Sequence, residues 1–126
     1  MNKALLGLCA YLTGHAAEDE AARFLQSKGF HLIAQNVAGK RGSGANELDL
    51  IMSDKKTLVF IEVKKRQDLT RAAEAVNPIV QRRLYRAAEL FLAKNPQYEN
   101  WDCRFDVVLI VPDQAPLHLQ NVIEAV

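Results

Sequence analysis

Two neighbouring stretches of the chain, 47–52 and 57–64, alternate in their pattern of side chains. In the first stretch, Leu48, Leu50 and Met52 occupy one set of alternating positions, and Glu47, Asp49 and Ile51 occupy the other. In the second stretch, one set consists of Val59, Ile61 and Val63, and the other of Leu58, Phe60, Glu62 and Lys64. Successive side chains of a strand point to opposite faces, so each stretch is predicted to be a strand with two distinct faces. The short polar segment 53–56 between them predicts an antiparallel hairpin.

Two further stretches have the periodicity of a helix. In residues 16–28, Ala17, Ala21, Phe24 and Leu25 recur at spacings of three and four, and Gly29 follows as a stop signal. A second helix is predicted from Asn77-Pro78 to about Lys94, because an asparagine cap before a proline is a strong helix start. Its apolar stripe is predicted to comprise Ile79, Leu84, Ala87, Ala88, Phe91 and Leu92.

The remaining apolar runs complete a single domain. Residues 30–37 and 104–111 are predicted strands, the latter central because it is strongly apolar and rich in β-branched residues. The segment 117–126 is compatible with a strand or a short helix. Residues 38–45 form a glycine-rich loop that does not match a Walker loop. With 126 residues, the chain is predicted to be one domain, 1–126, of α/β or α+β class with a mixed sheet between helices.

Charge and composition restrict the function classes. A formal net charge of +1 argues against binding nucleic acid through bulk positive charge. Basic residues nevertheless form local groups, which are either ordinary solvated faces or a basic rim around an acidic site. The apolar run in the first dozen residues is far too short to span a bilayer, and charged residues follow it. We therefore expect a cytoplasmic protein with no membrane partner.

Acidic side chains are predicted to gather on one face of the hairpin. If the chain turns near Asp54-Lys55, Glu62 falls opposite Glu47 or diagonal to Asp49. Crowded carboxylates repel one another unless a cation neutralises them, and Mg²⁺ is a common solution. The alternative is a set of salt bridges on a solvated strand face, which Glu62-x-Lys64 alone would favour.

The first predicted helix contributes one more acid. At 100° per residue, Glu18 projects between Ala22 and Leu25 on the apolar side of the helix. An unpaired carboxylate is costly to bury. Glu18 is therefore expected either at the rim of the core or beside a cation.

Several ordered motifs carry a resemblance to a known family. They are G-x-x-A-E-x-x-A-x-x-F-L from Gly14, E-L-D-L-I from Glu47, F-I-E-V-K-x-R from Phe60, A-V-N-P before the second helix, and R-F-D-V-V from Arg104. Together they resemble the uncharacterised bacterial YraN-type family of the restriction-endonuclease-like, PD-(D/E)xK, nuclease superfamily, which is related to archaeal-type Holliday-junction resolvases. The resemblance implies a restriction-endonuclease-like α/β fold, a central mixed sheet flanked by helices.

The resemblance also implies roles for individual residues. Asp49 and Glu62, with the backbone carbonyl of Val63, would hold Mg²⁺ or Mn²⁺, and Lys64 would be the catalytic lysine. Glu18 would match the helical glutamate that junction resolvases place beside the site. Glu47 is expected to be a supporting acid. The residues expected to contact nucleic acid phosphates are Lys40, Arg41, Arg66, Arg82 and Arg83.

This sequence departs from the family pattern at three places. Asn46 stands where the family usually has glycine, Val80 stands where it usually has a lysine, and residues 68–72 replace a stretch that often contains glycine. These changes leave the metal ligands intact and affect the surface that would receive a substrate.

The prediction is a metal-dependent nuclease that hydrolyses phosphodiester bonds. DNA is a more strongly expected substrate than RNA, and branched or structured DNA is the expected form. A homodimer is the expected assembly. The alternative is a catalytically silent module with a nuclease-like fold that binds nucleic acid or accompanies DNA repair.

Overall fold

One mixed sheet organises the part of the chain that the structure describes. The computed structural model describes residues 16–37 and 48–122; the glycine-rich loop lies outside them. The strands are β1 (His31–Val37), β2 (Leu48–Asp54), β3 (Thr57–Lys65), β4 (Asp102–Ile110) and β5 (Leu117–Leu119), in that order across the sheet. β3 and β4 are parallel, and the other neighbours are antiparallel. This α/β architecture agrees with the restriction-endonuclease-like fold.

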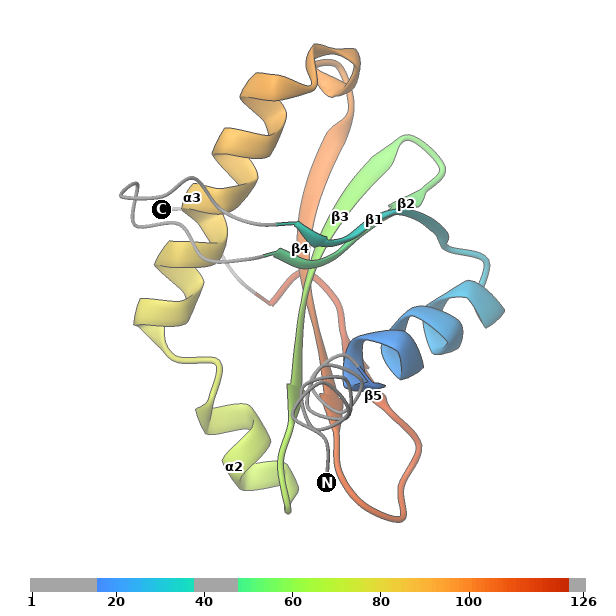
Figure 1. The fold of residues 1–126 in the computed structure, drawn as a ribbon, viewed down its shortest axis with the longest axis vertical. Coiled ribbons are helices and arrows are strands. Elements are labelled where there is room, and N and C mark those ends of the chain that lie inside the picture. The colour runs from blue at the N-terminus through green and yellow to red at the C-terminus, as the bar shows by residue number, and fades with distance from the viewer. Residues whose placement is uncertain (1–15, 38–47, 123–126) are drawn as a thin grey trace, which may run out of the picture.

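Helices cover both faces of this sheet (Figure 1). The helix of residues 16–27 packs Ala21, Ala22 and Leu25 onto one face. α3 (Pro78–Lys94) packs Leu84 and Ala87 onto the other. β3 and β4 therefore lie between two apolar layers, which explains why their sequences are nearly continuous hydrophobic runs. Among the described residues, no helix is long and apolar enough to cross a membrane.

The helix ends follow from local capping, as predicted. Gly29 has a φ of 96°, and the Phe30 N–H donates to the Leu25 carbonyl at 3.1 Å, which closes the first helix in a Schellman arrangement. The Asn77 side chain accepts a hydrogen bond from the Val80 N–H at 3.0 Å and caps α3. The α3 boundaries at Pro78 and Lys94 confirm the prediction from sequence.

Other predictions were incomplete or wrong. The short helix α2 (Leu69–Glu74) was not predicted; the Asp68 side chain caps it by accepting from the Arg71 N–H at 2.8 Å. Ile79 does not join the apolar stripe of α3 and is 54% exposed. It precedes Leu84 by five residues, which places it about 140° around the helix from that residue. The segment after β4 contributes the strand β5, and α3 is followed by the 3₁₀ turn η1 (Pro96–Tyr98).

The predicted hairpin is present, with a register that differs from the expected one. β2 and β3 are joined by Lys55 and Lys56, with Asp54 paired to Thr57. Lys55 has a φ of 58°, the left-handed conformation that a tight two-residue turn needs. The pairing of the two strands ends at Leu50 with Ile61.

The same register, continued by one residue, brings Asp49 directly opposite Glu62. The prediction from sequence that Glu62 lies diagonal to Asp49 is therefore wrong. Glu47, the other expected partner of Glu62, lies outside the described residues.

The strict alternation of faces predicted for β2 fails at its start. Ile51 packs in the cluster beneath α3, and so does Leu48, although regular alternation would place residues three positions apart on opposite faces. Leu50 and Met52 pack on the opposite face, as predicted. β1 and β2 turn towards α3 while β3 continues to α2 (Figure 1). The bend begins where β2 stops pairing with β3, and it carries Leu48 to the α3 side.

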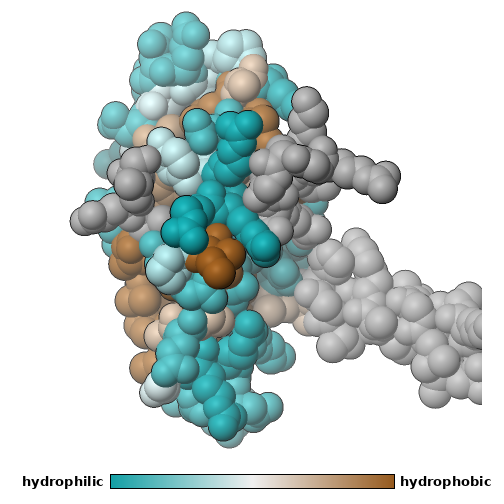
Figure 2. All heavy atoms as spheres, turned by 90° about the vertical axis from the view of Figure 1, so that its left-hand side faces the viewer, coloured by the Kyte–Doolittle hydropathy of each residue, from teal (hydrophilic) through white to brown (hydrophobic). Residues whose placement is uncertain are grey.

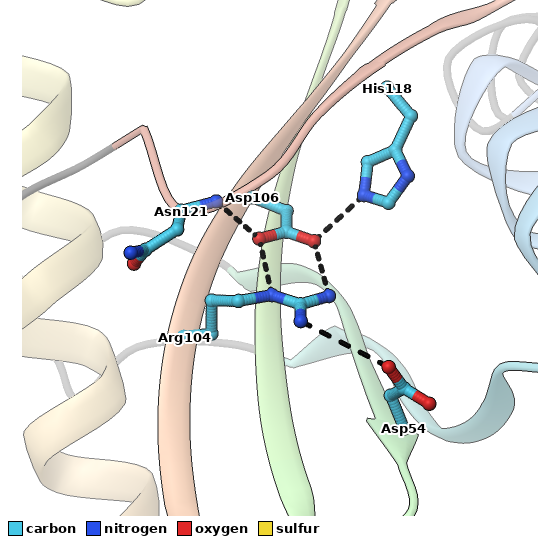
Figure 3. A network of polar contacts seen from close by, with 5 residues as sticks. All are labelled: Asp54, Arg104, Asp106, His118 and Asn121. Carbon is cyan, nitrogen blue, oxygen red and sulfur yellow. Dashed lines mark hydrogen bonds and ion pairs between the residues drawn. The ribbon is translucent and has the colours of Figure 1, made fainter.

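A buried ionic network ties β5 to β4 (Figure 3). Asp106 on β4 is fully buried and accepts two hydrogen bonds from the Arg104 guanidinium, at 2.9 and 3.0 Å. His118 Nε2 on β5 lies 2.7 Å from the same carboxylate, and the Asn121 N–H donates to it at 2.9 Å. Arg104 also lies 4.0 Å from Asp54. Each oxygen of the buried carboxylate is thus satisfied, which is the condition for a stable buried charge.

We predict that Asp106→Ala lowers the free energy of unfolding by about 3–5 kcal/mol, because the substitution leaves the Arg104 guanidinium without its buried partner. Urea denaturation followed by circular dichroism measures this loss. Asp102→Ala, at an exposed aspartate of the same strand, is the matched control and should change stability by less than about 0.5 kcal/mol. Equal losses for the two variants would mean that the network does not stabilise the fold.

Candidate active site

The Asp49 carboxylate lies where β2 and β3 separate. Its Oδ2 accepts a hydrogen bond from the Val63 N–H on β3 at 2.9 Å. The side chain thereby bridges the two strands just beyond their last backbone pair, Leu50 with Ile61. This bond directs the Asp49 carboxylate towards β3.

Glu62 and Lys64 stand two residues apart on β3, on one face of the strand. The Lys64 Nζ lies 2.8 Å from the Glu62 Oε1. Glu62 is only 7% exposed. Lys64 supplies the close cation that a carboxylate at this depth in the fold requires as a partner. This contact is a partly buried ion pair, unlike the solvated salt bridge that E-x-K alone favoured.

The first helix brings Glu18 towards the same place, in agreement with its predicted inward phase. Its neighbours Ala21 and Ala22 are buried against the sheet, while Glu18 itself is half-buried. Its Oε2 is buried and has no hydrogen-bond partner in the described part of the chain. The negative charge of Glu18 acts on Asp49. Glu18 therefore lies at the rim of the core, with one acceptor oxygen unused.

Burial and two neighbouring acids make Asp49 hard to ionise. Burial and then the negative charge of Glu62 raise the pKa of Asp49 to about 7 from an ordinary 3.8, and Glu18 adds to the rise. The Val63 N–H and the Lys64 ammonium oppose this rise in pKa. Near neutral pH, Asp49 thus exchanges readily between its protonated and charged forms, and a cation beside it would favour the charged form.

The oxygen donors present here fit a hard divalent cation. Asp49 and Glu62 offer carboxylates on adjacent strands, and Glu18, which has an unpartnered oxygen, is close enough to Asp49 to act on its charge. Across residues 16–37 and 48–122, no three His, Cys, Asp or Glu side chains form a ready-made metal site. Mg²⁺ does not require one, since it commonly binds one or two carboxylates and keeps several waters.

The other predicted site residues lie outside this group. Arg66, Arg82 and Arg83 are exposed, Arg66 directly after β3 and the other two on α3. The remaining three, Glu47, Lys40 and Arg41, are outside the described residues, so their expected roles stay predictions.

Sequence reasoning did not find Asn36, which the register of β1 and β2 places opposite Asp49. No motif marks it, and a lone asparagine near a strand end usually indicates a turn. The sequence also gave no indication of a role for the Val63 N–H, because a hydrogen bond from a backbone group does not depend on the residue pattern.

Comparisons with known proteins place the chain in a family. The model of "Uncharacterised protein family UPF0102" matches residues 17–110. UPF0102 protein amb4503 of Paramagnetospirillum magneticum is 40% identical over 108 residues, covering 86% of this chain and 84% of the relative. A UPF0102 protein of Parvibaculum lavamentivorans is 42% identical over 115 residues, covering 91% and 84%. A third, of Rhodopseudomonas palustris, is 36% identical over 118 residues, covering 94% and 87%. The chain therefore belongs to the uncharacterised protein family UPF0102.

Proposed function

We propose that this protein is a Mg²⁺- or Mn²⁺-dependent nuclease that hydrolyses phosphodiester bonds in DNA, with branched or structured DNA as its substrate. The observation that carries the proposal is the convergence of Asp49, Glu62 and Lys64 where β2 leaves β3. Two carboxylates of adjacent strands, a half-buried lysine and an N–H that holds one of the acids in place form an arrangement suited to phosphoryl chemistry.

Each side chain has a distinct task in this proposal. Asp49, Glu62 and the Val63 carbonyl would hold the cation. When bound, the cation would polarise a phosphoryl oxygen and lower the pKa of a water molecule. Lys64 would donate a hydrogen bond that orients the attacking water and offsets negative charge on the phosphate. Glu18, whose Oε2 is an unused acceptor, would accept the proton of that water.

The proposed reaction exchanges one phosphorus–oxygen bond for another. The water oxygen forms the new bond to phosphorus, and the bond to the leaving sugar oxygen breaks. The leaving oxygen then takes a proton from solvent. No oxidant or further reactant is needed.

Exposed arginines on α3 and directly after β3 would favour an anionic substrate. Figure 2 shows the side of the molecule that carries α2 and α3, where hydrophilic residues surround a small hydrophobic patch and a hydrophobic band follows the left edge. Arg66, Arg82 and Arg83 are exposed. We propose that they contact the phosphate backbone, which would add affinity without sequence preference.

The activity test uses purified full-length protein with duplex, single-stranded, flap and four-way-junction DNA and with RNA, each with Mg²⁺, Mn²⁺ or EDTA. We expect metal-dependent cleavage of at least one DNA substrate, and a decrease in rate of about 100-fold or more for Glu62→Gln and Lys64→Ala. Glu89→Gln and Lys65→Ala, both at exposed residues, are matched controls and should cleave like the unmodified protein.

Two results would contradict this proposal. Cleavage that persists unchanged in Glu62→Gln and Lys64→Ala would come from a contaminant. Binding of these DNAs without cleavage under every metal condition would instead support a silent nucleic-acid-binding module.

A second prediction concerns the arginines of α3. Arg82→Ala combined with Arg83→Ala should weaken binding of all duplex sequences alike. It should also reduce the slope of log affinity against log salt by about 0.9 for each phosphate that is no longer neutralised. Fluorescence anisotropy at several salt concentrations measures both quantities. Arg86→Ala on the same helix is the control, since Arg86 already pairs with Glu89 at 3.8 Å. An unchanged salt slope in the double variant would exclude α3 from the DNA interface.

A third prediction follows from the raised pKa of Asp49. Because that pKa in the fold, about 7, exceeds the ordinary 3.8, the protonated form of Asp49 is favoured in the folded state. The stability that the folded chain gains from protonated Asp49, relative to charged Asp49, is complete below the ordinary pKa of 3.8. It is lost as the pH rises through about 7. In EDTA, Asp49→Asn should therefore gain stability over the unmodified protein between pH 5.5 and 8.5. The gain should be at most a few kcal/mol, since one pKa unit corresponds to about 1.4 kcal/mol.

Thermal melts at the two pH values measure this difference, with Asp113→Asn as the control for removal of one negative charge. The same difference at pH 5.5 and 8.5 would show that Asp49 is not held in a repulsive, buried environment.

A further inference from the structure

A row of three polar residues crosses the sheet at the candidate site. Gln35 pairs with Leu50 and Val37 with Leu48, so Asn36 lies opposite Asp49. The β2–β3 register places Asp49 opposite Glu62 in turn. Asn36 on β1, Asp49 on β2 and Glu62 on β3 therefore occupy one continuous row, two residues of which belong to the proposed metal centre.

The bend of β1 and β2 occurs at this row. On β2, Leu48 and Ile51 both contact the core beneath α3, although regular alternation would place them on opposite faces. On β1, Ile33, Ala34 and Val37 contact the same core, and the pairing register with β2 shifts between Leu32 and Ala34. Asn36 has a φ of 54°, in the left-handed region. Residues with a Cβ rarely adopt this conformation, and asparagine is one of the few that do. At Asn36 the backbone of β1 therefore departs from the regular extended conformation.

Asn36 also has a buried polar atom that the fold does not use. In the described part of the chain, just two buried side-chain oxygen or nitrogen atoms lack a hydrogen-bond partner, Asn36 Oδ1 and Glu18 Oε2. Their sequence neighbours are linked, because the Gln35 side chain donates to the Asp19 carboxylate. The link holds β1 against the first helix beside these two residues.

Both unpartnered atoms require the same kind of ligand. Each is an oxygen acceptor, and leaving such an atom buried without a donor destabilises the folded chain. A metal ion that keeps part of its hydration shell supplies suitable donors, because the O–H groups of its water molecules point away from the ion. The position beside Asp49 is where such waters would lie.

We propose that Asn36 is a positioning residue of the metal centre: its Oδ1 accepts a hydrogen bond from a water molecule on the cation held by Asp49 and Glu62. Glu18 Oε2 accepts from a second such water. The inference rests on the proposed function, since it requires the cation. It adds a β1 residue to a centre otherwise built on β2, β3 and the first helix.

The competing explanation is conformational. In that explanation, asparagine occupies this position solely because it tolerates a positive φ. Asn36→Gly separates the two explanations, because glycine adopts the left-handed conformation freely and has no side-chain oxygen. Asn36→Asp retains a side-chain oxygen and a similar tolerance of this conformation.

The experiment measures Mn²⁺ affinity by isothermal titration calorimetry on the full chain without nucleic acid, together with the melting temperature in EDTA. We expect Asn36→Gly to melt in EDTA at or above the temperature of the unmodified protein, while its Kd for Mn²⁺ rises about 10-fold or more. Asn36→Asp should bind Mn²⁺ at least as tightly as the unmodified protein. Asn121→Gly, at another asparagine with positive φ, 52°, is the matched control and should leave the Kd unchanged.

The outcomes separate this inference from the proposed function. If Asp49→Asn abolishes Mn²⁺ binding but Asn36→Gly binds as the unmodified protein does, the role of Asn36 is overturned and the metal centre stands. Weaker binding by Asn36→Asp than by the unmodified protein would also overturn it, and this variant decides the matter if Asn36→Gly does not fold. If the unmodified protein binds no Mn²⁺, or Asp49→Asn binds it equally well, the metal centre and the role of Asn36 both fail.

Discussion

The hydrogen bond from the Val63 N–H to the Asp49 carboxylate is the interaction on which the candidate site depends. At this point β2 stops pairing with β3, and a backbone donor of β3 would otherwise have no partner on that side. The Asp49 side chain supplies the acceptor. One contact therefore satisfies the strand edge, holds the carboxylate beside Glu62, and allows β1 and β2 to turn away towards α3.

The layered fold explains why this arrangement is buried. β3 lies between β2 and β4, and helices cover both faces of the sheet, so a polar residue on β3 enters the interior. Glu62 follows Phe60 and Ile61 at the end of an otherwise apolar run. Its charge is stabilised by Lys64 two residues later, which places a carboxylate and an ammonium together in a largely water-excluded position.

The sequence was sufficient to predict the features that depend on local chemistry. Residue spacing and the Asn77-Pro78 cap defined the α3 boundaries, and strand alternation predicted the hairpin and the shared face of Glu62 and Lys64. Features that depend on distant contacts were missed. The opposition of Asp49 and Glu62 requires the turn to lie at Lys55 and Lys56, and face alternation alone is compatible with more than one turn position. Leu48 changed faces because the strand bends, and regular alternation assumes that it does not.

The short helix α2 was missed for a different reason. Its six residues span less than two turns and carry too little periodicity to reveal a helix, although Asp68 is a good cap. Asn36 could not have been found from its own residue type. It became a candidate site residue only because the register places it opposite Asp49 and its side-chain oxygen is buried without a partner.

The sheet contains two buried acidic environments, and their hydrogen bonding explains why they should serve different purposes. Asp106 receives two bonds from Arg104, one from Asn121 and a contact from His118, so its charge is fully compensated within the protein. Asp49 receives one backbone hydrogen bond and faces other acids, which raise its pKa to about 7. A saturated carboxylate has no capacity left for a ligand, and it contributes to stability. An undersaturated group of carboxylates destabilises the folded chain and gains stability when a cation arrives. By this criterion we propose that the acids around Asp49, and not the network at Asp106, bind a ligand.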